Sequence, residues 1–519
     1  MHYINQQTWE NLDQSLKNDG RVPVIFGANV MAALFFMRFP GVKEFYVIDN
    51  DKKKHGHCLD EYAFGINSSS EIYKKIGNKN EVFPRLNRDN AVIVINGTKR
   101  YKEMYEASVK AGFKHIYITV IMETHDATIV RGNEEDYFEA LYKYFAEECA
   151  KLPIEDKKIL VYTEGYYGDH GKAIINALLK LDQSYNITWA LKDSKDSLPK
   201  AYKKVPISNT LQYIKEFETA RVVIYSSELP ITFTKRPEQI YFQTTHWSSV
   251  TLKTFGLDFY KFHNLKYGIL RCIHDRDAID YLFTGSDFDE RTFRKAFGYA
   301  GKSIRVGSPR SDILFDTVGI RERICKKLGL NVENKYLLYA PTFRANLENG
   351  YIQKAYGGIL DYDMLIDVLS KKFGGTWKVM LRFHPDIGNK IQSDSLPDNI
   401  INVTDYPDVQ ELIVLSDVVM TDYSSLMFEP AYAYKPVFLY APDRNDYINR
   451  DRPLLIPYDE LPFPIAVSTK ELRCLIQNFD EKDYKVAVSK FFNKHGVHED
   501  GHASERAARA MMRIMRGKR

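Results

Sequence analysis

Short apolar runs alternate with longer amphipathic stretches along almost the whole chain. The runs have the length and composition of buried β-strands, and the stretches between them show the period of helices. The expected strands are Val22–Phe26, Glu44–Asp49, Ala91–Asn96, His115–Val120, Ile159–Thr163, Ile187–Leu191, Arg221–Tyr225, Gln239–Gln243, Tyr281–Gly285, Lys335–Tyr339, Lys378–Phe383, Ile401–Thr404, Val418–Thr421 and Val437–Tyr440. Strands separated by helices form parallel sheets, and such sheets bind ligands at the carboxyl ends of their strands.

The expected elements form three α/β segments, because a chain of 519 residues is too long for one hydrophobic core. We expect a Rossmann-like N-terminal domain in residues 1–150 and two further domains in residues 151–306 and 307–519. Two such domains that face each other across a cleft form the glycosyltransferase-B type of α/β fold. The sequence therefore predicts that fold, with one extra domain before it.

Composition and charge exclude several classes of protein. The chain has 44% hydrophobic and 27% charged residues, and its net charge of only +4 gives no reason to expect a nucleic-acid partner. Five scattered cysteines imply no disulfide framework, as in a reducing cytoplasm. The N-terminus does not resemble a signal peptide, and the longest apolar run, Val24–Phe39, is too short to span a bilayer. We therefore expect a cytoplasmic protein.

The C-terminal stretch Ala503–Arg519 has the pattern of a cationic amphipathic helix. Arginines recur at three- and four-residue steps on one face, and apolar side chains such as Met511 and Met515 occupy another. Two interpretations stay open. The helix rests on an anionic membrane surface, or it packs on its own domain with a solvated basic face.

Two positions in the N-terminal segment form a weak candidate nucleotide site. Gly27 follows the first expected strand, and Asp49 ends the second, where an acidic residue can bind a ribose. The glycine fingerprint is incomplete, because Asn29 and Ala32 follow Gly27. An alternative is that Gly27 only permits a tight turn.

The most informative stretch runs from Asp417 to Glu429. An apolar strand ends at Thr421, Asp422 lies in the turn, and Ser424 and Ser425 open a helix that carries Glu429. A helix start binds anions through its exposed N–H groups and dipole, so the serines can hold a diphosphate. Ser425 and Glu429 are four residues apart and share a face, which places the glutamate near a ribose. The same residues are also an ordinary capping pattern.

Other candidate residues follow neighbouring strands. Thr342 and Arg344 come after Tyr339-Ala-Pro341, and a hydroxyl with a forked guanidinium suits a diphosphate. Arg382 and His384 lie two apart and can stabilise charge on a transferring phosphoryl group. His246 follows a strand and can deprotonate a hydroxyl near neutral pH. For each of these positions a capping or strand-end role is the alternative.

These segments together resemble the CDP-glycerol glycerophosphotransferases, the primases and polymerases of teichoic acids and their capsule-building relatives. The resemblance covers residues 157–516 and rests on segments that occur in the family's order. They are Gln243-Thr-Thr-His246 with Lys253, Gly307-Ser-Pro-Arg-Ser-Asp-Ile-Leu314, Tyr339-Ala-Pro-Thr-Phe-Arg344, Arg382-Phe-His-Pro385, Thr421-Asp-Tyr-Ser-Ser425, Lys435-Pro-Val-Phe-Leu-Tyr440 and Asp500-Gly-His-Ala-Ser-Glu505.

The resemblance implies a glycosyltransferase-B fold and a set of residue roles. His246 matches the histidine of the acceptor-side domain that acts as base, and His384 matches a second essential histidine near the phosphates. Thr342, Arg344, Ser424 and Ser425 match positions that bind the donor diphosphate, and Glu429 matches a ribose or cytidine contact. The donor-nucleotide-binding domain is then residues 307–519.

The chain departs from the family at one position beside the first histidine. Trp247 stands where relatives have glycine, and we expect its bulk to narrow that side of the cleft. The N-terminal segment is outside the family core. Its stretch Val47–Gly56 resembles, more weakly, the Rossmann-like domains that precede sugar-modifying acyltransferases.

The resulting hypothesis is transfer of glycerol phosphate, or a related polyol phosphate, from a CDP-activated donor to a hydroxyl, with release of CMP. The resemblance implies a polyprenyl-diphosphate-linked or oligosaccharide acceptor, and hence contact with the inner face of the cell membrane. We expect no cofactor and no metal, because the sequence shows no second ligand pair near His55 and His57. Two rivals remain: a glycosyltransferase that uses a nucleotide sugar, and a non-catalytic nucleotide-binding assembly subunit.

Overall fold

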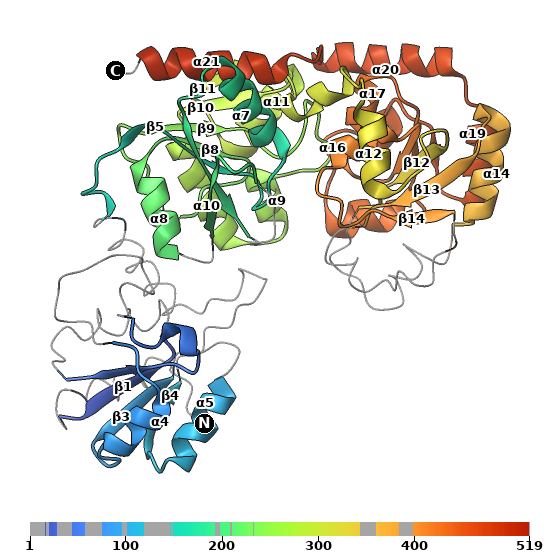
Figure 1. The fold of residues 1–519 in the computed structure, drawn as a ribbon. Coiled ribbons are helices and arrows are strands. Elements are labelled where there is room, and N and C mark those ends of the chain that lie inside the picture. The colour runs from blue at the N-terminus through green and yellow to red at the C-terminus, as the bar shows by residue number, and fades with distance from the viewer. Residues whose placement is uncertain are drawn as a thin grey trace. The chain divides into compact units, whose positions relative to one another are not determined.

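The computed structural model divides the chain into two compact units (Figure 1). One comprises Met1–Leu152 with Pro206–Glu218, and the other comprises Pro153–Val205 with Thr219–Arg519. The structure describes residues 20–28, 44–57, 75–95, 101–118, 149–192, 198–207, 210–231, 233–342, 360–383 and 399–517, with the single positions 16, 146 and 397.

The first unit contains a four-stranded parallel sheet with the order β2-β1-β3-β4. Its described elements are β1 (Val22–Phe26), β2 (Tyr46–Ile48), η1 (Lys52–Lys54), α4 (Lys79–Val82), η2 (Phe83–Arg85), β3 (Ala91–Ile95), α5 (Tyr101–Lys110) and β4 (His115–Ile118). All five residues of β3 are buried, as a central strand covered on both faces requires.

The second unit begins with a seven-stranded sheet in the order β11-β10-β9-β8-β5-β6-β7. The strands are β5 (Glu155–Tyr162), β6 (Asn186–Leu191), β7 (Lys203–Pro206), β8 (Ala220–Tyr225), β9 (Ile240–Gln243), β10 (Tyr281–Thr284) and β11 (Lys302–Arg305). The helices between them are α7 (Asp169–Leu181), α9 (Gly256–Phe262), α10 (Lys266–Ala278) and α11 (Asp287–Phe297). The helix α8 (Thr210–Thr219) follows β7 along the chain, but all except its last residue belongs to the first unit. We call this sheet, with α7 and α9 to α11, the N-lobe.

The rest of the second unit contains a six-stranded parallel sheet in the order β14-β13-β12-β15-β16-β17. The strands are β12 (Lys335–Tyr339), β13 (Trp377–Leu381), β14 (Ile400–Asn402), β15 (Val418–Thr421), β16 (Val437–Tyr440) and β17 (Ile465–Ala466). The helical elements are η3 (Pro309–Leu314), α12 (Ile320–Leu328), α14 (Tyr362–Phe373), α16 (Val409–Leu415), η5 (Ser425–Met427), α17 (Phe428–Tyr432), α18 (Arg444–Asp446), η6 (Tyr447–Asp451), η7 (Tyr458–Glu460), α19 (Thr469–Gln477), α20 (Glu481–His495) and α21 (Ala503–Gly517). We call this sheet, with α12, α14 and α16 to α20, the C-lobe.

Each large sheet reverses its strand order at one point. In the N-lobe β5 pairs with β8, and in the C-lobe β12 pairs with β15. The helices on either side of such a reversal diverge and leave a crevice at the carboxyl ends of the strands, where ligands bind in open α/β sheets. The loops after β5, β8, β12 and β15 are therefore the positions at which the fold favours a binding site.

The two lobes exchange segments across their junction. Val250 and Leu252, which follow β9, belong to the C-lobe core. In return α21, the last helix, buries Ala507, Met511 and Met515 in the N-lobe core and lies beside α7 (Figure 1). The apolar face of the C-terminal helix is thus covered by protein, which favours the packed interpretation over the membrane-surface one.

The structure confirms the expected mixed α/β fold with parallel sheets. The expected strands within the described residues are present, and the structure adds the short edge strands β7, β11 and β17, which the sequence pattern did not indicate. The domain boundaries at residues 150 and 306 stay predictions. Among the helices that the structure describes, none is both long and apolar enough to cross a bilayer.

Candidate active site

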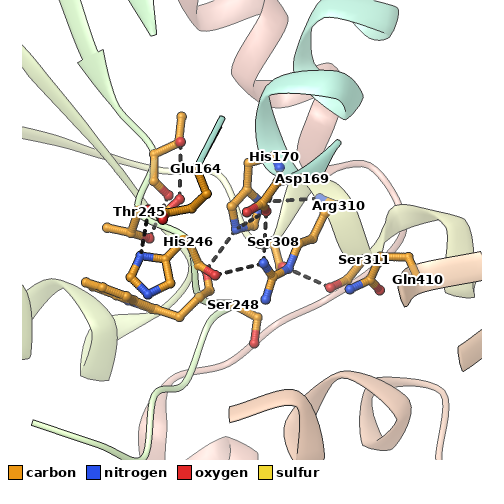
Figure 2. Close-up of polar contacts among 12 residues, drawn as sticks. Glu164, Asp169, His170, Thr245, His246, Ser248, Ser308, Arg310, Ser311 and Gln410 are labelled. Carbon is orange, nitrogen blue, oxygen red and sulfur yellow. Dashed lines mark hydrogen bonds and ion pairs between the residues drawn. The ribbon is translucent and has the colours of Figure 1, made fainter. Parts of the chain in front are cut away.

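His246 lies in the loop after β9, next to the strand reversal of the N-lobe. Its side chain is 53% exposed, and its Nδ1 is 3.8 Å from Oε1 of Glu164, which lies in the loop after β5 (Figure 2). The expected strand Gln239–Gln243 corresponds to β9, which ends at Gln243, so Thr244 and Thr245 separate His246 from the strand. A half-exposed imidazole with a carboxylate beside one nitrogen leaves its other nitrogen for a substrate proton.

Backbone strain concentrates around this histidine. In the described part of the chain, five residues other than glycine have positive φ, and Glu164, Asp169 and Thr245 are three of them. Such conformations cost about 1–3 kcal/mol each and persist where surrounding contacts hold them, commonly at functional sites. The strain supports a functional role for the loops after β5 and β9.

Arg310 of η3 connects these loops to the C-lobe. Its Nη1 donates to Oδ1 of Asp169 at 2.9 Å and to the carbonyl oxygen of His246 at 2.8 Å (Figure 2). Its Nε donates to Oε1 of Glu429 at 3.0 Å, and its Nη2 contacts the same oxygen. Burial opposes the charge of this guanidinium, but the two carboxylates outweigh it and raise the pKa of Arg310. Burial likewise opposes ionisation of Asp169, and Arg310 nevertheless lowers the pKa of this carboxyl.

His170 contacts the peptide group that follows Trp247 in the loop that carries His246. Its Nε2 lies 2.8 Å from the carbonyl oxygen of Trp247, and its Nδ1 accepts the backbone N–H of Arg310 at 3.3 Å. Burial lowers the pKa of His170 to about 4, so the ring is neutral at physiological pH. A neutral ring with one donor and one acceptor nitrogen fits both contacts.

Trp247 does not narrow the cleft, so that expectation is wrong. Its side chain is directed into the N-lobe, where the indole N–H donates to Oδ1 of Asp289 at 2.8 Å and the ring packs on Phe255 at 4.2 Å. The residue is only 8% exposed. The positive φ of Thr245 turns the chain so that His246 faces outward while its neighbour is buried.

In the C-lobe, Asp422 joins the two loops at the strand reversal. Its Oδ1 accepts the backbone N–H groups of Thr342 at 2.8 Å and of Tyr423 at 2.6 Å. The carboxylate is buried. Asp422 therefore shapes the loop that contains Thr342, and the predicted donor contacts of both residues stay predictions.

The helical start after β15 is present, but its first turn is the 3-10 helix η5, and the five-residue α17 follows it. Ser424 caps this turn by accepting from Leu426 N at 3.3 Å. The Oγ of Ser425 accepts from Leu252 N and lies 3.1 Å from Thr251 Oγ1, which joins the lobes. In this structure both hydroxyls are engaged within the protein, and their predicted diphosphate contacts are untested.

Glu429 is 1% exposed and fully engaged within the protein. Its Oε1 accepts from Arg310, and its Oε2 accepts from Nε2 of Gln410. Here the carboxylate positions Arg310, and the predicted ribose contact stays a prediction.

Of the predicted phosphate-binding cations, the structure describes Arg382. Its Nη1 donates to the carbonyl oxygens of Tyr406 at 2.5 Å and Val403 at 3.3 Å, and burial lowers the pKa of its guanidinium. Arg344 and His384 lie outside the described residues.

In the first unit, Asp49 braces the turn that Gly27 makes. Its Oδ2 accepts from Ala28 N at 2.8 Å and from Lys54 Nζ at 3.0 Å. Gly27 has a φ of 110°, which permits the tight turn. These contacts fit the turn interpretation, and nucleotide binding here is untested. Among the described residues of the whole chain, no group of three or more His, Cys, Asp or Glu side chains is arranged to hold a metal ion.

The sequence did not assign roles to Glu164, Asp169, His170 or Arg310. Arg310 lies inside the segment Gly307–Leu314 that carried part of the resemblance, so its position was visible but its partners were not. Glu164 and Asp169 follow a strand next to Gly165 and Gly168, a glycine-flanked loop that would have been a usable signal.

Comparison with known proteins places the chain in a family. Residues 145–513 match the model of the CDP-Glycerol:Poly(glycerophosphate) glycerophosphotransferase family. The chain is 26% identical over 388 residues to the teichoic acid poly(glycerol phosphate) polymerase of Bacillus subtilis, covering 72% of this chain and 51% of the relative. This chain thus spans about half the length of that polymerase.

Two shorter relatives are covered almost completely. The teichoic acid glycerol-phosphate transferase of Staphylococcus aureus is 27% identical over 391 residues, which is 70% of this chain and 95% of that protein. The teichoic acid ribitol-phosphate primase of Bacillus spizizenii is 28% identical over 401 residues, which is 75% of this chain and 97% of that protein.

Among solved structures, the wall teichoic acid polymerase TagF superposes with a TM-score of 0.65 at 24% identity, over 74% of this chain and 94% of that chain. This likeness supports a glycosyltransferase-like α/β fold for the second unit. Because the family match spans both lobes and most of the chain, the protein belongs to the CDP-glycerol:poly(glycerophosphate) glycerophosphotransferase family.

Proposed function

We propose that this protein transfers glycerol phosphate from CDP-glycerol to a hydroxyl group of a teichoic acid or capsular polymer and releases CMP. The observation that carries the proposal is the position of His246 within the matched region. It is a half-exposed imidazole at the carboxyl edge of the N-lobe sheet, at the junction with the lobe that carries the predicted donor-binding residues.

In the proposed reaction, the acceptor oxygen attacks the phosphorus that bears the glycerol. A new P–O bond forms, the bond to the bridging oxygen breaks, and CMP leaves with that oxygen. The acceptor proton passes to His246, and Glu164 beside Nδ1 stabilises the imidazolium that forms. Arg382, with the predicted Arg344 and His384, neutralises charge on the transferred group, and the start of η5 receives the leaving phosphate.

Because one of the relatives is a ribitol-phosphate primase, the identity of the polyol in the CDP-activated donor is the first property to test. Purified protein is incubated with CDP-glycerol or CDP-ribitol and a lipid-linked acceptor, and CMP release is measured together with product mass. We expect CMP release with CDP-glycerol and at least a hundredfold loss in His246→Ala, in keeping with removal of a general base. Release of UDP or GDP from nucleotide sugars instead would identify a glycosyltransferase. Donor binding without turnover would identify a binding subunit.

A lipid-linked acceptor requires peripheral contact with the inner face of the membrane. The burial of the apolar face of α21 leaves Arg509, Arg513 and Arg516 exposed, and we propose that these cations contact anionic headgroups. Flotation with phosphatidylglycerol vesicles tests this contact, and equal binding to neutral phosphatidylcholine vesicles would contradict it.

A further inference from the structure

We propose that Arg310 is a positioning residue that fixes the His246 loop, and that Glu429 of the C-lobe holds Arg310 in place. The inference rests on the proposed function, in which His246 receives the acceptor proton. Arg310 would act on the reaction only through the orientation of that histidine.

Two side chains hold the backbone of the His246 loop. The carbonyl oxygen of His246 accepts from Arg310 at 2.8 Å, and the next carbonyl oxygen, of Trp247, lies 2.8 Å from His170 Nε2. Thr245, just before them, has a φ of 57°. A strained residue keeps its conformation only where contacts over-determine it, and these two contacts fix the peptides that set the direction of the imidazole.

The guanidinium of Arg310 contacts the His246 loop with one edge and the C-lobe with the other. One edge, Nη1, faces Asp169 and the His246 carbonyl, while Nε and Nη2 face Glu429. The group is planar and rigid, so its two edges move together. Any displacement of Glu429 is therefore transmitted to the His246 peptide.

Arg310 lies on η3, a short helix that contacts both lobes. This helix contacts α7 and α21 on the N-lobe side and α16 and α17 on the C-lobe side. Glu429 lies on α17, and Gln410 on α16 holds its second oxygen. Arg310 therefore couples the relative position of the two lobes to the conformation of the loop that carries His246.

Burial makes this connection strong. The side chain of Arg310 is 14% exposed, and those of Asp169 and Glu429 are each 1% exposed. Removing one partner from such a group leaves a buried charge uncompensated. A lysine in place of Arg310 keeps the charge, but its three donors sit on one nitrogen, which cannot occupy the positions of Nη1 and Nε at once.

The test combines Arg310→Lys with His246→Ala in a double-mutant cycle on the full chain. In the otherwise wild-type protein we expect Arg310→Lys to lower kcat for CMP release about 100-fold, with KM for CDP-glycerol changed less than about threefold, as for a misplaced catalytic group. In the His246→Ala background the same change should lower kcat less than about threefold, because the residue it positions is already absent. Equal effects in both backgrounds would overturn the inference.

A second readout needs no turnover. Hydrogen–deuterium exchange of the amides in residues 244–249 should rise about tenfold in Arg310→Lys and in the isosteric Glu429→Gln, measured without donor. Unchanged exchange in both variants would refute the coupling whatever the activity. If Arg310→Lys does not fold, Glu429→Gln takes its place in the cycle.

The matched control is Lys172→Met. Lys172 also forms an ion pair between the lobes, with Asp408 at 2.7 Å, but within the described part of the chain it makes no hydrogen bond to the His246 loop. We expect its kcat and loop exchange to stay within about twofold of wild type, since a partly exposed pair contributes little. If Lys172→Met changed kcat and loop exchange as much as Arg310→Lys does, loss of any contact between the lobes would explain both effects, and the inference would be overturned. A wild-type protein that releases no CMP from any CDP-alcohol would instead refute the proposed function.

Discussion

Replacing Gly307 with alanine should lower the free energy of unfolding of the second unit. The loss should exceed the cost of placing a residue other than glycine at a positive φ. Gly307 follows β11 and has a φ of 91°, a conformation that costs other residues about 1–2 kcal/mol. A Cβ at this position would lie 3.0 Å from Ala503 Cβ, Arg506 Nη2 and Glu499 Oε2. None of these atoms moves freely.

Each neighbour is held by further contacts. Ala503 begins α21, and its backbone N–H donates to Asp312 at 3.0 Å. The Glu499 carboxylate accepts from Ser308 N at 3.0 Å, and Arg506 Nε donates to Val306 O at 2.9 Å. The extra methyl group must therefore displace the start of α21, and forcing a methylene into a filled site costs about 1–3 kcal/mol.

Gly329 provides a matched control. It ends α12 with a φ of 66°, and a Cβ there would meet no atom within 4 Å. Gly329→Ala has the same conformational cost of about 1–2 kcal/mol but gains about 0.4–1 kcal/mol from a less flexible unfolded chain, so we expect a net loss of about 0–1.6 kcal/mol. For Gly307→Ala we expect a loss of about 1–4.6 kcal/mol, because crowding adds about 1–3 kcal/mol to the same terms.

The assay is urea-induced unfolding followed by tryptophan fluorescence. It reports mainly on the second unit, because three of the four tryptophans, Trp189, Trp247 and Trp377, lie there. Losses for the two variants that agree within about 0.5 kcal/mol would refute the reasoning, since the contacts at 3.0 Å would then have no energetic consequence.

Three further predictions follow from buried contacts. Burial raises the pKa of Glu499 from 4.5 to about 7, so between these values the folded state binds a proton that the unfolded state has lost. The free energy of unfolding therefore falls by on the order of 3 kcal/mol as pH rises from 4.5 to 7. Glu499→Gln removes this titration and should flatten the dependence of Tm on pH in that range. An unchanged dependence of Tm on pH would contradict this prediction. Trp247→Gly introduces the glycine expected from the family. It should lower the free energy of unfolding in the urea assay by about 3–5 kcal/mol, because it leaves a cavity at a buried site and removes a hydrogen-bond donor to Asp289. A loss below about 1 kcal/mol would contradict the buried position of Trp247. Asp312→Ala should cost about 1–2 kcal/mol and increase hydrogen–deuterium exchange at the first turn of α21, since Asp312 accepts from Ala503 N and Ser504 N; unchanged exchange there would argue against this cap.

The sequence alone predicted the sheets because the signal for a buried parallel strand is local. Runs such as Val22–Phe26, Lys335–Tyr339 and Val418–Thr421 coincide with observed strands. The strands that were missed lie at sheet edges. β7 and β11, with the sequences KKVP and KSIR, are the two edges of the seven-stranded sheet, and edge strands carry charges that hide the apolar pattern.

The sequence also placed His246, Asp422 and Ser424 at strand ends, because a strand end is a local feature as well. It could not give the direction of a side chain after the strand. Whether Trp247 or His246 faces outward depends on the positive φ of Thr245, a conformation that no local preference of threonine predicts.

Only the tertiary structure decided the role of Arg310 and the packing of α21. Asp169, His246 and Glu429 stand 141, 64 and 119 positions from Arg310 along the chain, and the fold alone brings them to one guanidinium. The amphipathic pattern of α21 showed that one face must be covered, and the N-lobe core that covers it comes from residues far earlier in the sequence. The periodicity of a segment shows which of its faces must be buried, whereas the residues that cover that face are determined by long-range packing.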